Sequence, residues 1–375
     1  MDALMLPLNW QRVRLGDIAE INPPTIIPNV FYYIDLENVE KGQLLNKQLM
    51  TKNKAPSRAR RLLSKNDILY QLVRPYQRNN YFFTLNGDYV ASTGYAQIRT
   101  LQNPSFLYFA LHSNYFVNAV LDRCEGTSYP AVSSNELKKC EVILPPLNEQ
   151  SAIVNILSGL DRYLYSLDAL ILKKESVKKA LSFELLSQRK RLKGFNQAWQ
   201  SVRLGDICEI VKGQQINKIS LNNTDKYPVI NGGIDFLGYT NKFNVSKNTI
   251  AISEGGTCGY IRFMTSNFWS GGHNYSLQKI SNKVNNLCLY HILKSYEKDI
   301  MKLGVGSGLK NIQLKALKDF EIPLPPLNEQ IAIANILSDL DHEIISLKNK
   351  KRQFENIKKA LNHDLMSAKI RVLEK

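Results

Sequence analysis

One long phrase occurs twice in the chain and limits what the chain can fold into. Residues 144–161 read LPPLNEQSAIVNILSGLD, and residues 324–341 read LPPLNEQIAIANILSDLD, with three differences in eighteen positions. Upstream, VRLGDIAEI at 13–21 returns as VRLGDICEI at 202–210. Two copies of this length are too few and too large for a solenoid of short repeats. The sequence therefore predicts a tandem duplication with internal pseudo-two-fold symmetry.

A heptad pattern follows each copy of the phrase. Apolar residues recur alternately four and three positions apart, which is typical of a helix that packs against another helix. From Glu149 to Leu192 such a helix would extend about 65 Å at 1.5 Å per residue. Asn148 and Asn328 are expected to cap the two helices, and the helices are expected to meet as an antiparallel coiled coil. The stripe residues are Ile153, Leu157, Leu160, Leu164, Leu167, Ile171, Leu181, Leu185 and Leu192, then Ile333, Leu337, Leu340, Ile344, Leu347, Phe354, Leu361, Leu365 and Val372.

Polar residues interrupt both stripes at Lys174, Lys178, Gln188, Lys351 and Lys358. One interpretation is local exposure to solvent. The other is that these residues set the register against a partner helix. We favour solvent exposure from the sequence.

The frame divides the chain into four parts: 1–146, 147–195, 196–326 and 327–375. The first and third parts contain short β-branched runs bounded by turn residues, such as DILYQLV and NTIAISEGG, followed by short helical patterns. The predicted fold class is therefore α+β, with two α+β domains separated by two long antiparallel helices. The first copy carries nine extra residues between its RLGDI element and Gly126, so the domains diverge inside a preserved frame.

Basic residues concentrate in the first domain. The chain has 49 Lys and Arg against 33 Asp and Glu, a net charge of +16, which favours a polyanionic partner such as DNA or RNA. Arginine can pair with guanine edges or clamp phosphates, and asparagine can read adenine. The alternative is a solvated basic surface. The DNA-binding candidates here are Lys52, Lys54, Arg58, Arg60, Arg61, Arg74, Tyr76, Arg78, Asn79 and Asn80, with Thr127 and Ser128 in the turn before the repeated phrase.

The corresponding segment of the second domain is rich in glycine and nearly neutral, with Arg262 balanced by Glu254. Glycine lets a backbone approach a ligand closely, and small polar and aromatic side chains can read or stack on bases. For Trp269 and Tyr275, burial in tight hairpins is as plausible as recognition. The candidates are Thr257, Tyr260, His273 and Asn274, with Lys310 in the repeated turn.

No pattern for catalysis stands out. The five cysteines are scattered without a C-x-x-C pair, which argues against zinc sites and disulfides. NPPT at 22–25 lacks the aromatic residue of an amino-methyltransferase motif, and GVGSGLK at 304–310 lacks the spacing of a phosphate loop. We therefore predict no catalytic residues, no metal and no cofactor bound by this chain. No signal peptide or long apolar run is found, so a cytoplasmic location is expected.

Two divergent domains, each opened by RLGDI and closed by LPPLNEQ and a heptad helix, resemble the specificity subunit of type I restriction-modification systems. The resemblance covers essentially the whole chain. It implies two target-recognition domains that each read one half of a bipartite double-stranded DNA sequence in the major groove, with the helices as a spacer. It also implies two modification (methyltransferase) subunits docked on the repeated frames, and possibly two restriction subunits, with S-adenosylmethionine, ATP and Mg²⁺ on those partners.

Other functions stay open at this point. The chain could be the non-catalytic specificity chain of a stand-alone methyltransferase or a related restriction system. It could also be a methyltransferase or nuclease itself, which the absent cofactor and metal motifs disfavour. A coiled-coil scaffold without specific DNA readout would bind DNA no better than any basic protein once salt is raised.

Overall fold

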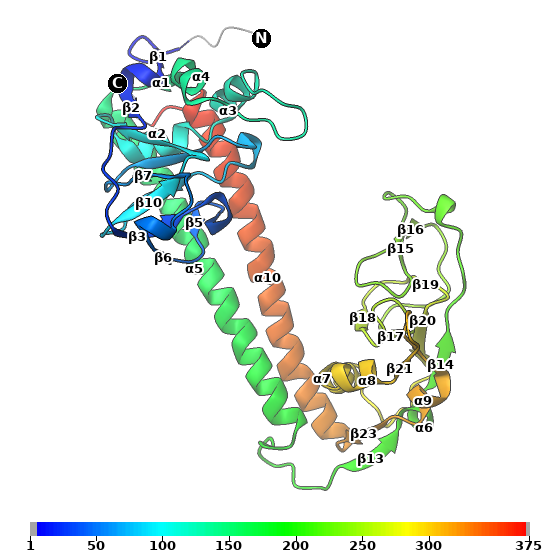
Figure 1. Ribbon diagram of the computed structural model, residues 1–375. Helices are drawn as coiled ribbons and strands as arrows, with labels where there is room; N and C mark the ends of the chain where they lie inside the picture. The colour runs from blue at the N-terminus through cyan, green and yellow to red at the C-terminus, as the bar shows by residue number, and fades with distance from the viewer. Residues whose placement is uncertain (1–5, 373–375) are drawn as a thin grey trace. The chain divides into compact units, whose positions relative to one another are not determined.

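The computed structural model describes residues 6–372, and the chain divides into two compact units (Figure 1). The first unit combines residues up to Asp168 with those from Lys350 onward, and the second comprises Ala169–Asn349. Each unit holds a mixed α/β portion and a part of both long helices. The functional boundaries expected at residues 146, 195 and 326 stay a prediction.

The first unit contains two four-stranded sheets. One has the order β6-β3-β10-β7, with β10 parallel to β3, and the other has the antiparallel order β2-β11-β8-β9. Strand β1 pairs with β12, and β4 pairs with β5. The strands are β1 (Gln11–Arg14), β2 (Ala19–Ile21), β3 (Val30–Ile34), β4 (Val39–Glu40), β5 (Gln43–Leu44), β6 (Gln48–Thr51), β7 (Ala59–Leu62), β8 (Ile68–Gln71), β9 (Tyr81–Phe82), β10 (Tyr89–Ser92), β11 (Tyr95–Thr100) and β12 (Glu141–Leu144). The short helices are α1 (Leu15–Ile18), η1 (Leu36–Asn38), η2 (Lys52–Lys54), η3 (Pro75–Gln77), α2 (Pro104–Ala110), α3 (Asn114–Leu121) and α4 (Ser134–Lys139).

The second unit repeats this plan. Its sheets have the orders β14-β20-β17-β18 and β16-β15-β19, with β19 parallel to β15, and β13 pairs with β23. The strands are β13 (Gln200–Arg203), β14 (Glu209–Lys212), β15 (Tyr227–Ile230), β16 (Gly238–Thr240), β17 (Thr249–Ser253), β18 (Ile261–Met264), β19 (Trp269–Ser270), β20 (Asn274–Gln278), β21 (Gly304–Val305), β22 (Asn311–Ile312) and β23 (Glu321–Leu324). The short helices are α6 (Leu204–Ile207), η4 (Lys218–Ser220), α7 (Asn286–Ser295), α8 (Glu297–Lys302) and α9 (Leu314–Lys318).

The matching strand orders confirm the duplication and the α+β class predicted from the repeat. Strand β7 and the β4–β5 hairpin have no counterpart among the described strands of the second unit, which locates the main addition in the first copy. The glycine of each RLGDI element allows a close helix contact. A Cβ on Gly16 would lie 3.1 Å from the Cβ of Lys138, and one on Gly205 would lie 3.0 Å from the Cβ of Lys318.

Two helices of 40 residues follow the repeated phrases: α5 (Leu147–Leu186) and α10 (Leu327–Met366). Each is about 60 Å long at 1.5 Å per residue. The prediction that the first helix continues to Leu192 is wrong, because the backbone turns left-handed at Gln188, as it does at Ala368 after α10. The prediction that Asn148 caps α5 is also wrong. Asn148 lies inside the first turn and is exposed, as is Asn328 in α10.

Within each unit, α5 and α10 lie side by side and antiparallel (Figure 1), since partner numbers fall along α10 as they rise along α5. Four lysines at interrupted stripe positions form ion pairs across the helices, and their side chains are only 27% to 30% exposed. Our favoured interpretation of these lysines as solvent-exposed is therefore wrong, and they meet a facing acid instead. Gln188 lies beyond the helix. The pairs are Lys174–Glu343 and Lys178–Asp341 in the second unit, and Lys351–Asp168 and Lys358–Asp161 in the first.

The repeated phrases also supply the core. Ile153 and Leu157 of α5 are fully buried in the main core of the first unit, and Ile333 and Leu337 of α10 are buried in that of the second. Burial of each such side chain stabilises the fold by about 1.5–3 kcal/mol. Each α/β portion is thereby fixed to the start of a different long helix. None of the described helices is long and apolar enough to cross a membrane.

Candidate nucleic-acid interface

In the first unit, a buried carboxylate joins the start of α5 to the residue before β1 and to the segment after α10. Glu149, in the first turn of α5, is only 2% exposed. It accepts a hydrogen bond of 3.0 Å from the indole Nε1 of Trp10, just before β1. The guanidinium of Arg371, just after α10, donates two more at 2.9 and 3.1 Å. Such charge-assisted, bidentate contacts fix orientation as well as adding free energy. We call this arrangement the clasp.

The second unit has the same clasp. Glu329 of α10 is 1% exposed and accepts hydrogen bonds from the Trp199 indole at 3.0 Å and from both the Nε and an amino group of Arg191. The two clasps therefore explain why the tryptophan, the glutamate and the arginine recur in both copies. They place each α/β portion in the same way on the start of one long helix and the end of the other.

The glutamine of each LPPLNEQ phrase connects the long helix to a second helix. The Gln150 amide donates to the Pro145 carbonyl at 2.8 Å and accepts from the backbone N–H of Asn103, the cap of α2. Gln330 makes the matching contacts with Pro325 and with Asn285, the cap of α7. Both glutamines are 1% exposed. The glutamate and the glutamine of the phrase are thus internal in both copies, where they hold the frame together.

In the first unit, two loops predicted to bind DNA meet. Val73 pairs with Ala131, and the backbone N–H of Arg74 donates to the Pro130 carbonyl at 2.7 Å. The Arg74 guanidinium lies over the Tyr129 ring, 4.2 Å from its centroid. This contact holds the half-buried arginine beside the exposed turn that contains Thr127 and Ser128. Tyr76, which follows in η3, is 50% exposed.

A second basic group surrounds a cleft of about 480 Å³ beside β7, lined by Lys52, Arg60 and Arg61 and by residues 22–25. Burial, with Arg60 as the lesser cause, lowers the pKa of the Arg61 guanidinium. The Nε of Arg61 is buried without a hydrogen-bond partner. Lys54 is exposed on η2 beside this group. An anion such as a phosphate would satisfy the charges that gather here.

Arg58 differs from its basic neighbours, because its charge is already paired. Its guanidinium donates to the Asp35 carboxylate and, at 3.2 Å, to the Tyr33 hydroxyl. The hydrogen bond to Tyr33 and the charge of Asp35 raise the Arg58 pKa. Arg58 is nevertheless exposed, so it remains on the candidate surface with less net charge to offer.

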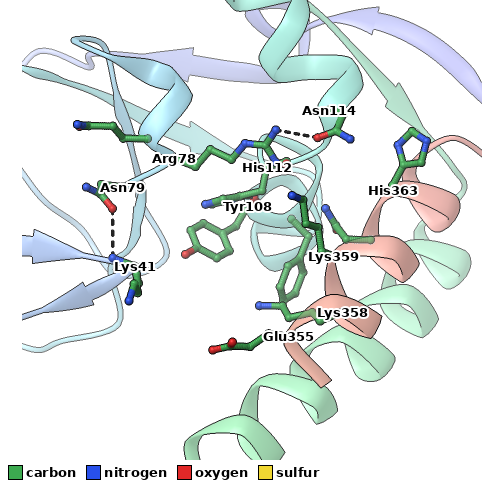
Figure 2. Close-up of a pocket in the computed structure, with 13 residues that line it drawn as sticks. Lys41, Arg78, Asn79, Tyr108, His112, Asn114, Glu355, Lys358, Lys359 and His363 are labelled. Atoms are coloured by element: carbon green, nitrogen blue, oxygen red, sulfur yellow. Dashed lines mark hydrogen bonds between the residues drawn. The ribbon is translucent and has the colours of Figure 1, made fainter. Parts of the chain in front are cut away.

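Three further candidates are held by internal contacts, and Figure 2 shows two of them, Arg78 and Asn79. Arg78 donates to the His112 carbonyl at 2.9 Å and to the Asn114 side chain at 2.7 Å. Burial lowers the Arg78 pKa. Asn79 accepts from the Lys41 backbone N–H, and these residues line a cavity of about 300 Å³ beside α10. Asn80 is 2% exposed, and its Oδ1 accepts from the backbone N–H of Gln71 at 2.8 Å, so its amide does not face a ligand.

Glycine-rich turns meet in the second unit, but the glycines approach each other rather than open space. A Cβ on Gly213 would lie 2.1 Å from the Gly271 carbonyl oxygen, and one on Gly232 would lie 2.5 Å from the Gly255 carbonyl oxygen. Gly232 also has a φ of 79°, which favours glycine. These glycines therefore serve the packing of backbone on backbone, and close approach of a ligand to the glycine-rich segment stays a prediction.

Glu254 lies among three polar side chains near these turns, those of Lys212, Tyr275 and His273. Its carboxylate, in a residue 8% exposed, lies 2.7 Å from the Lys212 ammonium and accepts from the Tyr275 hydroxyl at 3.2 Å. The Nδ1 of His273 is 3.9 Å away, and the His273 side chain is 53% exposed. Burial first, and then Glu254, raise the Tyr275 pKa to about 12. Arg262 does not pair with Glu254, because its guanidinium donates to loop carbonyls.

The remaining candidates of the second unit divide between exposed and buried. Thr257 is half-buried and donates from its backbone to the Gly232 carbonyl at 2.8 Å. Tyr260 lies under the Lys294 ammonium, 4.3 Å from the ring centroid. Lys310 is exposed on the β21–β22 turn. Asn274 is 2% exposed.

Tyr275 follows the structural interpretation of a buried side chain, whereas Trp269 is only half-buried. The Trp269 indole donates to the Gln214 carbonyl, and the Tyr275 hydroxyl is buried. The structure thus brings together Thr257 in the turn after β17, His273 between β19 and β20, and Lys310 between β21 and β22. Asn274 is buried beneath them.

Sequence reasoning missed two residues at these sites. Tyr129 directly follows Thr127 and Ser128, and its place in the repeated turn was a usable signal. Lys212 follows the second RLGDI element, but its contact with Glu254 across 42 residues left no local pattern.

Cysteine and metal chemistry add nothing to these surfaces. All five cysteines are free, and burial raises the pKa values of Cys140, Cys208 and Cys288 to about 11, 12 and 12. Among residues 6–372, no group of three His, Cys, Asp or Glu is placed to hold a metal ion.

Comparisons with known proteins give a consistent family. The family model of the type I restriction modification DNA specificity domain matches residues 7–174 and again 196–356. The chain is 24% identical to the type I restriction enzyme MjaVIII specificity subunit of Methanocaldococcus jannaschii, over 99% of this chain and 95% of that relative. It is 37% and 36% identical to putative type I specificity subunits of Mycoplasma pneumoniae and Mycoplasma genitalium, over 42% and 40% of this chain. These matches span 44% and 40% of the length of the two Mycoplasma relatives.

Solved structures show the same fold. The S subunit of a type I restriction-modification system from M. genitalium matches with a TM-score of 0.69 at 20% identity, over 96% of this chain and 98% of that one. The HsdS subunit from Thermoanaerobacter tengcongensis matches with a TM-score of 0.51 at 25% identity, over 97% and 98% of the two chains.

Proposed function

The chain belongs to the family of the type I restriction modification DNA specificity domain, with two copies of that domain in tandem, and from this premise we propose that it selects the DNA target of a modification complex. Each unit reads one half of a bipartite double-stranded sequence. The two long helices hold the half-sites at a fixed spacing. The chain supplies recognition and no catalytic group.

One observation carries this proposal: the two units share the clasp and the buried glutamine of their frame and differ where the loops are exposed. The clasp and the buried glutamine recur in both units. After β8 the first unit presents Arg74 against Tyr129, whereas after β17 the second presents Glu254 with Lys212 and His273. Two surfaces of different chemistry at equivalent places on one frame are suited to reading two different sequences. A scaffold would have no need for that difference.

The exposed faces of the long helices support two equivalent partner subunits. In the first unit, Tyr165 and Ile357 are 69% and 50% exposed. The positions 180 residues away, Ile345 and Val177, are 55% and 39% exposed in the second unit. Repeated apolar positions of this kind fit one docking surface presented twice. We propose that two methyltransferase subunits bind there and carry S-adenosylmethionine, and that restriction subunits with ATP and Mg²⁺ can join them in the cytoplasm.

The test is to co-express the chain with the modification subunit of its own system and map N6-methyladenine across the host DNA by single-molecule sequencing. We expect a bipartite motif with a constant gap. An assembled complex that methylates without any sequence preference would refute the proposal.

A domain exchange sharpens the test. Replacing residues 22–125 with the corresponding segment of another family member keeps the frame and changes the exposed loops of the first unit. We expect one half of the methylated motif to change while the other half and the gap stay the same. An unchanged motif would refute the assignment of the first half-site to this unit.

A further inference from the structure

An exposed apolar loop borders the glycine-rich turns of the second unit. It follows β15 and contains Ile234, Asp235, Phe236 and Leu237, all of them exposed. Ile234 is 55% exposed and Phe236 is 45% exposed. Large apolar side chains gathered at the tip of a surface loop indicate a contact with another molecule.

The loop begins inside the candidate interface. The Gly232 carbonyl accepts from the backbone N–H of Thr257, and the Asn231 side chain accepts from that of His273 at 3.0 Å. A Cβ on Gly232 would lie 3.2 Å from the Cβ of His273. A DNA duplex that reaches Thr257 and His273 would therefore also meet the loop.

Arg262 holds the loop in one conformation. Its guanidinium donates to the carbonyls of Gly233, at 3.2 Å, and of Ile234. It also lies 5.1 Å from the centroid of the Phe236 ring, whose edge packs on Tyr239. An arginine used in this way orders a surface loop before binding, which reduces the entropy that binding would otherwise cost.

The chemistry of the tip selects which part of DNA it fits. Residues 234–237 contain no basic side chain, and Asp235 places an exposed carboxylate between Ile234 and Phe236. A carboxylate is unfavourable beside a phosphate, so the tip does not fit the DNA backbone. The major groove offers an apolar group on a base edge, the C5-methyl of thymine, which apolar side chains contact.

We propose that Ile234 and Phe236 contact thymine methyl groups in the half-site read by the second unit, with Arg262 as a positioning residue. This inference rests on the proposed function. It adds two specificity-determining residues to a surface that otherwise reads through polar side chains.

The experiment uses the complex of the full chain with its modification subunit. Its affinity is measured for duplexes of the mapped motif in which each thymine of that half-site is replaced, one at a time, by deoxyuridine, which lacks the C5-methyl. We expect one or two positions at which the unaltered complex loses about fourfold in affinity, as for one methyl group returned to water. For Ile234→Ala or Phe236→Ala, the replacement should have no effect at the thymine that the removed side chain contacted.

The matched control is Ile219→Ala, which removes a side chain that is 92% exposed on η4 of the same unit. This variant should lose affinity on the deoxyuridine duplexes as the unaltered complex does. Because an apolar contact releases no counterions, the salt dependence of binding should be the same for all variants.

A complex that discriminates its motif but responds to no thymine replacement overturns this inference and leaves the proposed function standing. The inference is also overturned if the Ile234→Ala variant loses as much affinity as the unaltered complex on every deoxyuridine duplex. A complex with no sequence preference at all overturns both.

Discussion

The packing of glycine on backbone in the second unit predicts the effect of a single methyl group. Gly213 follows β14, and a Cβ there would lie 2.1 Å from the Gly271 carbonyl oxygen and 2.5 Å from that of Ser270. Both neighbours are backbone, so they cannot rotate away as a side chain does. Gly213→Ala should therefore lower the free energy of unfolding by about 1–3 kcal/mol, the usual cost of overpacking a well-packed site.

Urea denaturation followed by tryptophan fluorescence measures this effect, since Trp269 adjoins the packed turn. With a slope of about 2 kcal/mol per molar urea, the midpoint should fall by about 0.5–1.5 M. The matched control is Gly308→Ala, because nothing lies within 4 Å of a Cβ at Gly308. This change should be neutral or slightly stabilising. Equal midpoints for the two variants would refute the argument that Gly213 is required by packing.

Three further outcomes follow from the ion pairs, the recognition loops and a buried histidine. Lys178→Glu should destabilise the second unit by about 1 kcal/mol, and adding Asp341→Lys should restore the loss in urea unfolding if the pair sets the antiparallel register. Arg74→Ala should relax the methylated motif at one position of the first half-site and cost about 1–3 kcal/mol in binding; an unchanged motif would contradict its role. Burial lowers the pKa of His291 to about 4, so the stability it contributes is complete above its ordinary pKa of about 6.5 and is lost as the pH falls toward 4. Phe109 occupies the same place in α2, so His291→Phe keeps the core apolar without a titrating group. As the pH falls from 6.5 to 4, the free energy of unfolding of His291→Phe should rise by up to about 3 kcal/mol relative to that of the parent. Urea unfolding at each pH measures this difference.

Local patterns in the sequence were sufficient to predict the frame. The heptad stripe predicted both long helices, and the repeat predicted two α+β units, because periodicity and duplication can be seen in a sequence without any knowledge of tertiary contacts. The end of α5 was missed because it has no glycine, and Gln188 adopts the left-handed conformation instead. Contact of Lys178 and Lys358 with a facing helix was considered but not favoured, because a heptad stripe does not show which acid the facing helix presents. That acid is set by the register of two segments more than 160 residues apart.

The candidate surfaces were harder to predict, since exposure and charge depend on distant partners. Arg58 looked equivalent to Arg60 in the basic run, yet Asp35, 23 residues earlier, pairs with its charge. Asn80 looked like a reader of adenine, yet it is buried and supports the backbone at Gln71. Composition pointed to the segments that hold these candidates. It could not separate the side chains that present a surface from those that hold it in place.

The two units differ in whether their residues are synthesised as one continuous segment. The second unit is one uninterrupted stretch, Ala169–Asn349, whereas the first needs residues from Lys350 onward, including the Arg371 that completes its clasp. At about 5–20 residues per second, the segment from Ala169 to Arg371 takes about 10–40 s to synthesise. During that interval the newly made portion of α5 lacks its partner α10, and the core that contains Ile153 and Leu157 lacks Leu365 and Met366. The first unit therefore completes its core only after the second unit has been synthesised.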